Sequence, residues 1–90
     1  MALESKPSPG WVDSRFGIVI RRLRQERGWS QEKLAELADL NRSYLGEIER
    51  GDARPSIGSA EKIALAFDIR LSSLVGLCEH ENGALLAIAG

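Results

Sequence analysis

Apolar residues recur at helical spacing in several separate stretches of the chain, and polar or turn-forming residues divide these stretches. The first stretch is the clearest, with apolar residues at positions i, i+3, i+4 and i+7: Phe16, Val19, Ile20 and Leu23. This spacing predicts a helix that begins near Ser14 and ends before Gly28. The alternation of apolar and polar residues that is typical of half-buried strands is not found, so the pattern predicts an all-α fold.

Two short helices separated by a tight turn are predicted within residues 30–51. Ser30 is suited to be the N-cap of the first helix, and Asn41 is suited to be the N-cap of the second. Asp39 lies in the turn between them, where a left-handed backbone is often needed and Asp tolerates it. Gly51 is a natural residue to follow the last helical position. The turn is too short for the helices to lie antiparallel, so the segment is interpreted as a helix-turn-helix.

Each of these two helices has an apolar face. In the first helix, three apolar residues share one side: Leu34, Leu37 and Ala38. In the second helix, Leu45 and Ile48 point inward, and polar residues occupy the opposite side: Ser43, Glu47 and Arg50. One side of the second helix is therefore expected to pack, while the other side is free to contact a partner.

Two more helices are expected after the turn Arg54-Pro55-Ser56. Ser56 would cap a fourth helix with an apolar face: Ile57, Ala60, Ile63, Ala64 and Phe67. A fifth short helix would follow Arg70, a poor capping residue, and carry four apolar residues: Leu71, Leu74, Val75 and Leu77. We therefore expect a compact five-helix bundle over residues 14–77, with residues 1–13 as a flexible arm and residues 78–90 as a tail.

Length and composition narrow the class of protein. Ninety residues allow one domain, and a single cysteine, Cys78, cannot form an internal disulfide, which is typical of a reducing compartment. No apolar run approaches the roughly 18 residues of a membrane span, and no signal peptide pattern is found at the start. We expect a soluble cytoplasmic protein without a membrane partner.

The charge is unevenly distributed along the chain. The net charge is −1, but residues 14–55 contain nine basic and seven acidic groups, for a local charge of +2. The flanking residues contain three basic and six acidic groups, for −3. A local excess of Lys and Arg is compatible with a phosphate-rich partner, and the weak overall charge predicts modest nonspecific affinity.

Many residues of the central region also match, in order and spacing, the sequence pattern of a known family. They are Gly17, Ile20, Arg21, Leu23, Arg24, Gly28, Trp29, Ser30, Gln31, Leu34 and Ala35, then Tyr44, Leu45, Ile48, Glu49, Arg50, Gly51, Arg54, Pro55 and Ser56. This order resembles the Cro/CI-type helix-turn-helix domain, or XRE family, over about residues 14–77. It is similar to small stand-alone regulators such as restriction–modification controller proteins. The chain departs from the pattern at Asp39, where Gly is common, and at Arg70, where Ser or Thr is common.

The resemblance implies a lambda-repressor-like fold and a sequence-specific DNA-binding transcriptional regulator, with residues 42–50 as the recognition helix in the major groove. Its base-contacting residues would be Arg42, Ser43 and Glu47. Contacts to the DNA backbone would come from Gln31, Asn41, Tyr44, Arg50 and Arg54. Arg24 and Glu49 would form a structural ion pair between the first and third helices. Double-stranded DNA is the expected partner, and no cofactor, metal or small-molecule ligand is expected.

Several of these residues also have a purely structural explanation. Gln31 can be a solvated first helical residue, and Arg42 can be a surface charge paired with Glu47 or Asp39. Ser43 also stabilises a helix end. Glu47 is often simply a solvated acid. The Tyr44 ring can pack against the core with only its hydroxyl exposed.

A single domain of this kind contacts only a few base pairs, so we expect a homodimer that binds a palindromic operator. The dimer interface is expected at the fifth helix, through Leu71, Leu74, Val75 and Leu77. The apolar segment 84–89 is an alternative dimer surface, and a disordered C-terminal end is the plainer explanation for it.

Two other functions remain open at the level of the sequence. The chain can be the antitoxin of a toxin–antitoxin pair, which binds DNA and a partner protein, or an adaptor that uses the fold for protein contact alone. An enzyme is not expected. Four neighbouring residues, Cys78, Glu79, His80 and Glu81, could form at best a weak metal cluster, and an exposed acidic tail is the favoured explanation.

Overall fold

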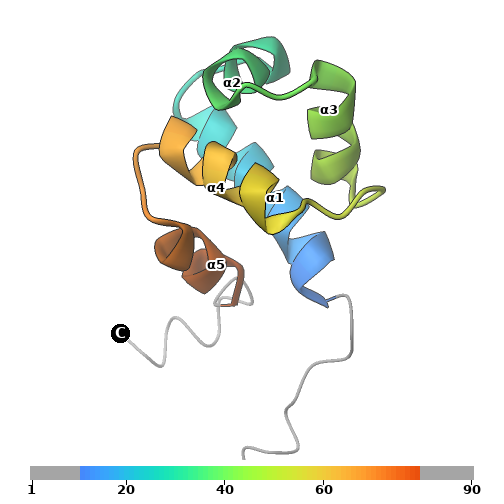
Figure 1. Cartoon of the computed structure of the whole chain (residues 1–90), viewed down its shortest axis with the longest axis vertical. Coiled ribbons are helices and arrows are strands. Elements are labelled where there is room, and N and C mark those ends of the chain that lie inside the picture. The colour runs from blue at the N-terminus through green and yellow to red at the C-terminus, as the bar shows by residue number, and fades with distance from the viewer. Residues whose placement is uncertain (1–10, 80–90) are drawn as a thin grey trace, which may run out of the picture.

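The computed structural model describes residues 11–79, with side chains from Arg15 onward. This part of the chain folds into five α-helices and no strands, as the apolar pattern predicted (Figure 1). The helices are α1 (Trp11–Glu26), α2 (Gln31–Ala38), α3 (Arg42–Arg50), α4 (Ile57–Ala66) and α5 (Leu71–Glu79). The prediction of an all-α bundle with a central helix-turn-helix is confirmed.

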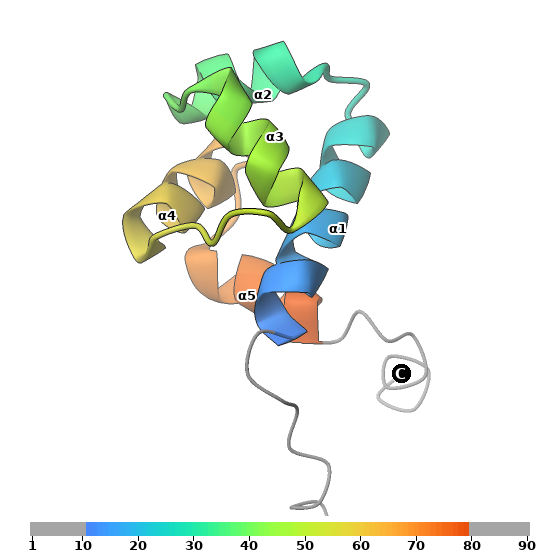
Figure 2. The same ribbon diagram turned by 90° about the vertical axis from the view of Figure 1, so that its right-hand side faces the viewer.

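The helices surround one core. The first helix, α1, contacts α3 and α5, while α4 contacts α2 and α5. Turned by 90°, the molecule presents α3 on its outer surface, with α2 beside the start of α3 and α5 at the far end of the bundle (Figure 2). The helix-turn-helix and α5 therefore occupy opposite ends of the molecule.

The core is built from apolar residues of all five helices. The buried residues are Phe16, Val19, Ile20, Leu34, Ala35, Ala38, Leu45, Ile48, Ala60, Ile63, Ala64, Phe67, Leu74 and Cys78. At the end of the core, the Trp29 ring stacks on Phe67 with centroids 5.5 Å apart, and the Arg27 guanidinium lies over both rings. This aromatic cluster joins the loop after α1 to the end of α4.

The capping residues fix where the two helices of the helix-turn-helix begin. The Ser30 hydroxyl accepts from the amide of Lys33 at 3.0 Å, and Asn41 Oδ1 accepts from the amides of Ser43 and Tyr44 at 2.8 and 3.2 Å. Asp39 takes the left-handed conformation expected in the turn, with φ of 56°. These local interactions set the direction in which α3 leaves the turn.

A glycine permits the close crossing of α1 and α3. A Cβ added at Gly17 would lie 2.7 Å from the carbonyl oxygen of Glu49 and even nearer to that of Ile48. Atoms this close clash, and backbone carbonyls cannot rotate away as side chains can. The absence of a side chain at Gly17 therefore sets how near α3 lies to the core.

The helix boundaries differ from the sequence expectation at both ends of the chain. Helix α1 begins at Trp11, not near Ser14, so residues 11–13 are helical and do not belong to an arm. Helix α5 extends to Glu79 and includes Cys78, which is buried in the core and does not begin a tail. The apolar pattern missed these ends because apolar spacing locates a helix end only to within a few residues. Residues 1–10 and 80–90 lie outside the described part.

Two residues predicted to lie on apolar faces are exposed. Ile57 is 79% exposed and Leu37 is 44% exposed. Ile57 was expected on the packed face, but as the first residue of α4 it lies at the edge of the bundle, where no helix covers it. None of the helices in the described residues is long and apolar enough to cross a membrane.

Candidate nucleic-acid interface

The outer side of α3 combines exposure with hydrogen-bonding side chains. Arg42, Ser43, Glu47 and Arg50 are all exposed, whereas Leu45 and Ile48 are completely buried on the opposite side of the helix. The view in Figure 2 looks onto this helix, with α2 behind its first turn. The structure thus brings together the three residues predicted to contact bases on one accessible surface.

Arg42 forms an ion pair that the sequence did not indicate. Its Nε lies 3.1 Å from a carboxylate oxygen of Glu32 in α2, rather than beside Glu47 or Asp39. The two side chains are 55% and 68% exposed, and pairs with this exposure contribute at most about 1 kcal/mol. Glu32 therefore holds Arg42 weakly beside the first turn of α3.

Arg24 in the last turn of α1 and Glu49 in α3 form an ion pair between the two helices. Arg24 Nε and Nη2 donate to the two Glu49 oxygens at 2.7 and 3.0 Å, and Nη1 donates to the carbonyl of Trp29 at 2.9 Å. The side chains are only 12% and 2% exposed. The hydrogen bond to Glu49 raises the pKa of Arg24, assisted by the negative charge of Glu49 and opposed by burial. This two-pronged pair fixes α3 against the core.

Gln31 is turned toward the same carboxylate. Its Nε2 donates to Glu49 Oε1 at 3.0 Å, so the side chain spans from the first position of α2 to the last turn of α3. Gly46 lies underneath: a Cβ added there would be 3.7 Å from Gln31 Oε1 and 3.3 Å from Arg50 Nη1. Gly46 is therefore covered by side chains of the chain itself.

The predicted backbone-contacting residues lie around the edge of α3. Asn41 caps α3 with its side-chain oxygen Oδ1, and Arg50 Nε donates to a carboxylate oxygen of Asp52 at 3.0 Å. The half-buried Tyr44 directs its hydroxyl to the carbonyl of Arg54 at 3.5 Å, which fits a packed ring with an outward hydroxyl. Arg54 itself is exposed. These side chains form a rim around the residues predicted to contact bases.

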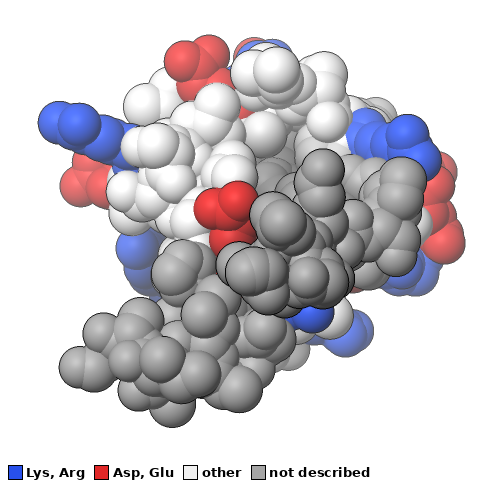
Figure 3. Space-filling view, turned by 90° about the horizontal axis from the view of Figure 1, so that it is seen from below, with Lys and Arg blue, Asp and Glu red and all other residues white. Residues whose placement is uncertain are grey.

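The predicted dimer surface on α5 needs one correction. Leu74 is completely buried in the core of its own chain, so it is not available to a second copy. Leu74 belongs to the core that α5 shares with α1 and α4, whereas Leu71, Val75 and Leu77 remain partly exposed. Seen from the end where α5 lies, the described surface includes a stretch of uncharged atoms with charged groups at its edges (Figure 3).

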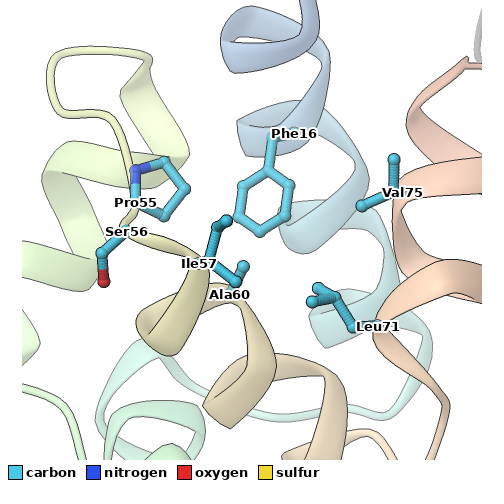
Figure 4. A pocket seen from close by; sticks show the side chains of 7 residues that line it. All are labelled: Phe16, Pro55, Ser56, Ile57, Ala60, Leu71 and Val75. Atoms are coloured by element: carbon cyan, nitrogen blue, oxygen red, sulfur yellow. The ribbon is translucent and has the colours of Figure 1, made fainter.

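An apolar pocket of about 270 Å³ adjoins this surface (Figure 4). Its lining combines α1, the turn before α4, and the starts of α4 and α5: Phe16, Pro55, Ser56, Ile57, Ala60, Leu71 and Val75. Ile57, which is mostly exposed, lies at the rim. The pocket and Ile57 together extend the apolar surface of α5 onto α4.

Of the four residues considered as a weak metal cluster at the C-terminal end, the structure describes only Cys78 and Glu79. Cys78 is completely buried, whereas Glu79 is exposed, so the two side chains point in different directions. His80 and Glu81 lie outside the described residues. No other group of metal-binding side chains is found between residues 11 and 79.

Two contacts of the site were missed by the sequence analysis. The pairing of Arg42 with Glu32 and the hydrogen bond from Gln31 to Glu49 both join residues of different helices. Neither follows from spacing along the chain, because each depends on the angle between α2 and α3. A signal for the second contact lay in Gly46, whose missing side chain leaves room for Gln31.

The fold and the exposed α3 define the class of protein: a helix-turn-helix domain of the kind that contacts nucleic acid through its second helix. Comparison with known families agrees, since residues 20–74 match the helix-turn-helix family. The chain belongs to the Cro/CI-type, or XRE, helix-turn-helix family.

Relatives of known name are regulators of transcription or control proteins. The immunity repressor protein of Bacillus phage phi105 is 46% identical over 60 residues, which cover 67% of this chain and 42% of that protein. The transcriptional regulator SutR of Escherichia coli is 36% identical over 63 residues, covering 69% of this chain and 35% of that protein. The chain thus spans less than half the length of these two relatives. Control protein C.MunI of Mycoplasma is 40% identical over 71 residues, covering 78% of this chain and 96% of that protein.

Solved structures give the same assignment. The restriction–modification controller protein C.AhdI from Aeromonas hydrophila is 44% identical with a TM-score of 0.65, covering 68% of this chain and 92% of that one. The controller protein C.Esp1396I, solved as a tetramer with its natural 35 base-pair operator, is 29% identical with a TM-score of 0.71. That match covers 83% of this chain and 96% of the controller chain.

Proposed function

We propose that this protein is a sequence-specific DNA-binding regulator of transcription that acts in the cytoplasm and inserts α3 into the major groove. The exposed outer side of α3 carries this proposal, since its inner side is fully packed and cannot bind a partner. A helix of this diameter fits the major groove of B-DNA. The repressors and controllers among its relatives support a role in transcription.

Base contacts in this proposal come from three side chains near the start and middle of α3. The Arg42 guanidinium matches the O6 and N7 acceptors of guanine, Ser43 can donate or accept, and Glu47 can accept from the amino group of cytosine. Arg42 must leave Glu32 to bind a base. Because both partners are exposed, this exchange costs little.

Contacts to the DNA backbone set the orientation of the domain. Gln31 lies at the start of α2, where amide groups and the helix dipole favour a phosphate. Asn41 at the start of α3 and Tyr44, whose hydroxyl reaches the carbonyl of Arg54, supply polar groups, and Arg50 and Arg54 supply positive charge. Such contacts raise affinity for any sequence and fix the position of α3 without specifying bases.

The functional unit proposed here is a homodimer on a palindromic operator. Leu71, Val75 and Leu77 of α5 form the interface, and Ile57 with its neighbouring pocket extends it. Two copies related by a twofold axis place their α3 helices about one DNA turn apart, which doubles the sequence recognised. The operator-bound tetramer of C.Esp1396I supports assembly on DNA for a related chain.

Selection of bound sequences from a random DNA pool tests this function. The wild-type chain is expected to enrich a palindrome with a guanine in each half-site. Arg42→Ala should lose the preference at that position, with a discrimination of about 1–3 kcal/mol removed and weaker effects elsewhere. A pool without enrichment, or affinity that does not fall with salt, would contradict the proposal and favour an adaptor that binds protein alone.

A further inference from the structure

Glu49 accepts more hydrogen bonds than its ion pair with Arg24 requires. Its side chain is only 2% exposed, and Arg24 donates to both of its oxygens. Oε1 nevertheless accepts a second donor, Nε2 of Gln31, at 3.0 Å. This third hydrogen bond connects the buried pair to the surface at the start of α2.

The chemistry of a carboxylate selects one orientation of the Gln31 amide. An ionised carboxylate only accepts hydrogen bonds, so Gln31 must present its NH₂ group, and not its carbonyl, to Glu49. Arg24 keeps Glu49 in place, because its own guanidinium is also held by the carbonyl of Trp29. The orientation of the Gln31 amide thus follows from a fixed, buried charge.

The packing around Gln31 agrees with a held side chain. It is only partly exposed, and it lies over the bare backbone of Gly46, where an added Cβ would be 3.7 Å from Oε1 and 4.0 Å from Nε2. One Nε2 hydrogen points to Glu49, which leaves the second hydrogen for another acceptor.

We infer that Glu49 is a positioning residue for DNA binding: it orients Gln31 so that the remaining Nε2 hydrogen and the first amides of α2 meet the same phosphate. This inference rests on the proposed function. With the amide reversed, the Gln31 carbonyl would direct its lone pairs at the phosphate instead. Glu49 therefore does more than join α1 to α3, because it also prepares a neutral side chain to donate before DNA arrives.

A double-mutant cycle on operator affinity separates positioning from stability. The variants are Gln31→Ala, Glu49→Gln and their combination, measured at 10 °C after circular dichroism has verified that each one is folded. Glu49→Gln keeps the shape but no longer dictates which end of the Gln31 amide faces it. Each single change should weaken binding about three- to tenfold, and Glu49→Gln should cause no further loss once Gln31→Ala is present.

Ile20→Val is the matched control. It weakens the packing of α1 in the core but leaves Arg24, Glu49 and Gln31 in place, so any effect on affinity should be the same with and without Gln31→Ala. Equal losses from Glu49→Gln in both backgrounds would overturn the inference. So would a Gln31→Ala variant of normal affinity, and in that case the proposed function stands if Arg42→Ala still weakens binding. Absence of operator binding by the wild-type chain would overturn both.

Side-chain amide NMR of the wild-type protein tests the same point without relying on a variant that must fold. In the free protein, the chemical shift of one Nε2 hydrogen of Gln31 should differ from the value typical of a solvent-exposed glutamine. The chemical shift of the second Nε2 hydrogen should change only when operator is added. Two unshifted hydrogens in the free protein would show that Glu49 does not hold the amide. The exposed Gln25 of α1 provides an internal reference.

Discussion

Two arginines of the molecule, Arg24 and Arg42, illustrate how surroundings determine what one residue type does. Arg24 is nearly buried and binds Glu49 through two nitrogens, so its charge is committed to the fold. Arg42 is half exposed and pairs loosely with Glu32, so its guanidinium can exchange partners. The first residue stabilises the domain, and the second is available for recognition.

Removing Arg24 should therefore affect stability before it affects DNA binding. Arg24→Ala leaves Glu49 buried without its charged partner, which should cost about 3–5 kcal/mol of unfolding free energy. Denaturant unfolding monitored by circular dichroism measures this loss. A variant that melts like the wild type but has lost operator binding would refute the structural role.

The same pair has a defined pH behaviour. The pKa of Arg24 is raised in the folded state, so the stability that it contributes is present below its unfolded value and disappears only as the pH rises beyond it. Because an arginine keeps its proton far above neutral pH even in the unfolded chain, this contribution should stay constant at physiological pH. Unfolding free energies of the wild type and Arg24→Ala should accordingly keep a constant difference between pH 7 and 9.

The two arginines also differ in how far the sequence indicated their contacts. The pairing of Arg24 with Glu49 was expected from the family resemblance, although 25 positions separate the two residues. The contact of Arg42 with Glu32 was not expected, since surface pairs depend on the angle between α2 and α3. Residue types were thus informative about candidate roles, whereas exposed partners required the folded geometry.

At the scale of helices, short-range signals were the most predictable. Ser30, Asn41 and Ser56 were all identified as N-caps, because a capping side chain bonds amides only two or three positions away. The start of α1 and the exposure of Ile57 were missed, since apolar spacing marks neither where a helix begins nor whether another helix covers its first residue. The position of an N-cap can thus be predicted from the sequence more reliably than the exposure of a helical residue.

Removing the cap of α3 should loosen the helix proposed to enter the major groove. Asn41→Ala leaves the amides of Ser43 and Tyr44 without their acceptor, at a cost of about 0.5–2 kcal/mol in unfolding free energy. Asn41→Asp keeps the acceptor, so it should preserve stability but lower operator affinity by adding negative charge near phosphates. Equal stability of Asn41→Ala and wild type would argue against this cap.

The crossing of α1 and α3 should not tolerate a side chain at Gly17. Gly17→Ala improves helix propensity by up to about 1 kcal/mol, but its methyl group meets backbone carbonyls of α3, and we expect a net loss of about 1–3 kcal/mol. In the control Gly58→Ala, the added Cβ makes only ordinary contact and stability should hold or rise. Thermal denaturation compares the two, and a Gly17→Ala variant as stable as Gly58→Ala would contradict the close crossing.

In the whole molecule, the proposed DNA-binding helix and the proposed dimer helix lie at opposite ends of one core. The helix-turn-helix occupies one end, and α5 occupies the other (Figure 1). The sequence indicated α5 as a dimer surface but included Leu74, which the fold buries. A short apolar helix has no pattern that separates its inner residues from its outer ones until its neighbours are known.

The proposed dimer can be tested at Ile57 without disturbing the core. Because Ile57 is 79% exposed, Ile57→Asp should leave the fold of the monomer intact, yet it places a charge at the rim of the pocket where a second copy would pack. Analytical ultracentrifugation should show a shift from dimer to monomer, and operator affinity should fall at least tenfold, since a single domain contacts only one half-site. The matched control is Ile18→Asp, which changes an exposed isoleucine of α1 that does not line the pocket. If both variants sediment like the wild type, the interface lies elsewhere, and if wild type itself is monomeric at concentrations that saturate the operator, the twofold arrangement on DNA fails.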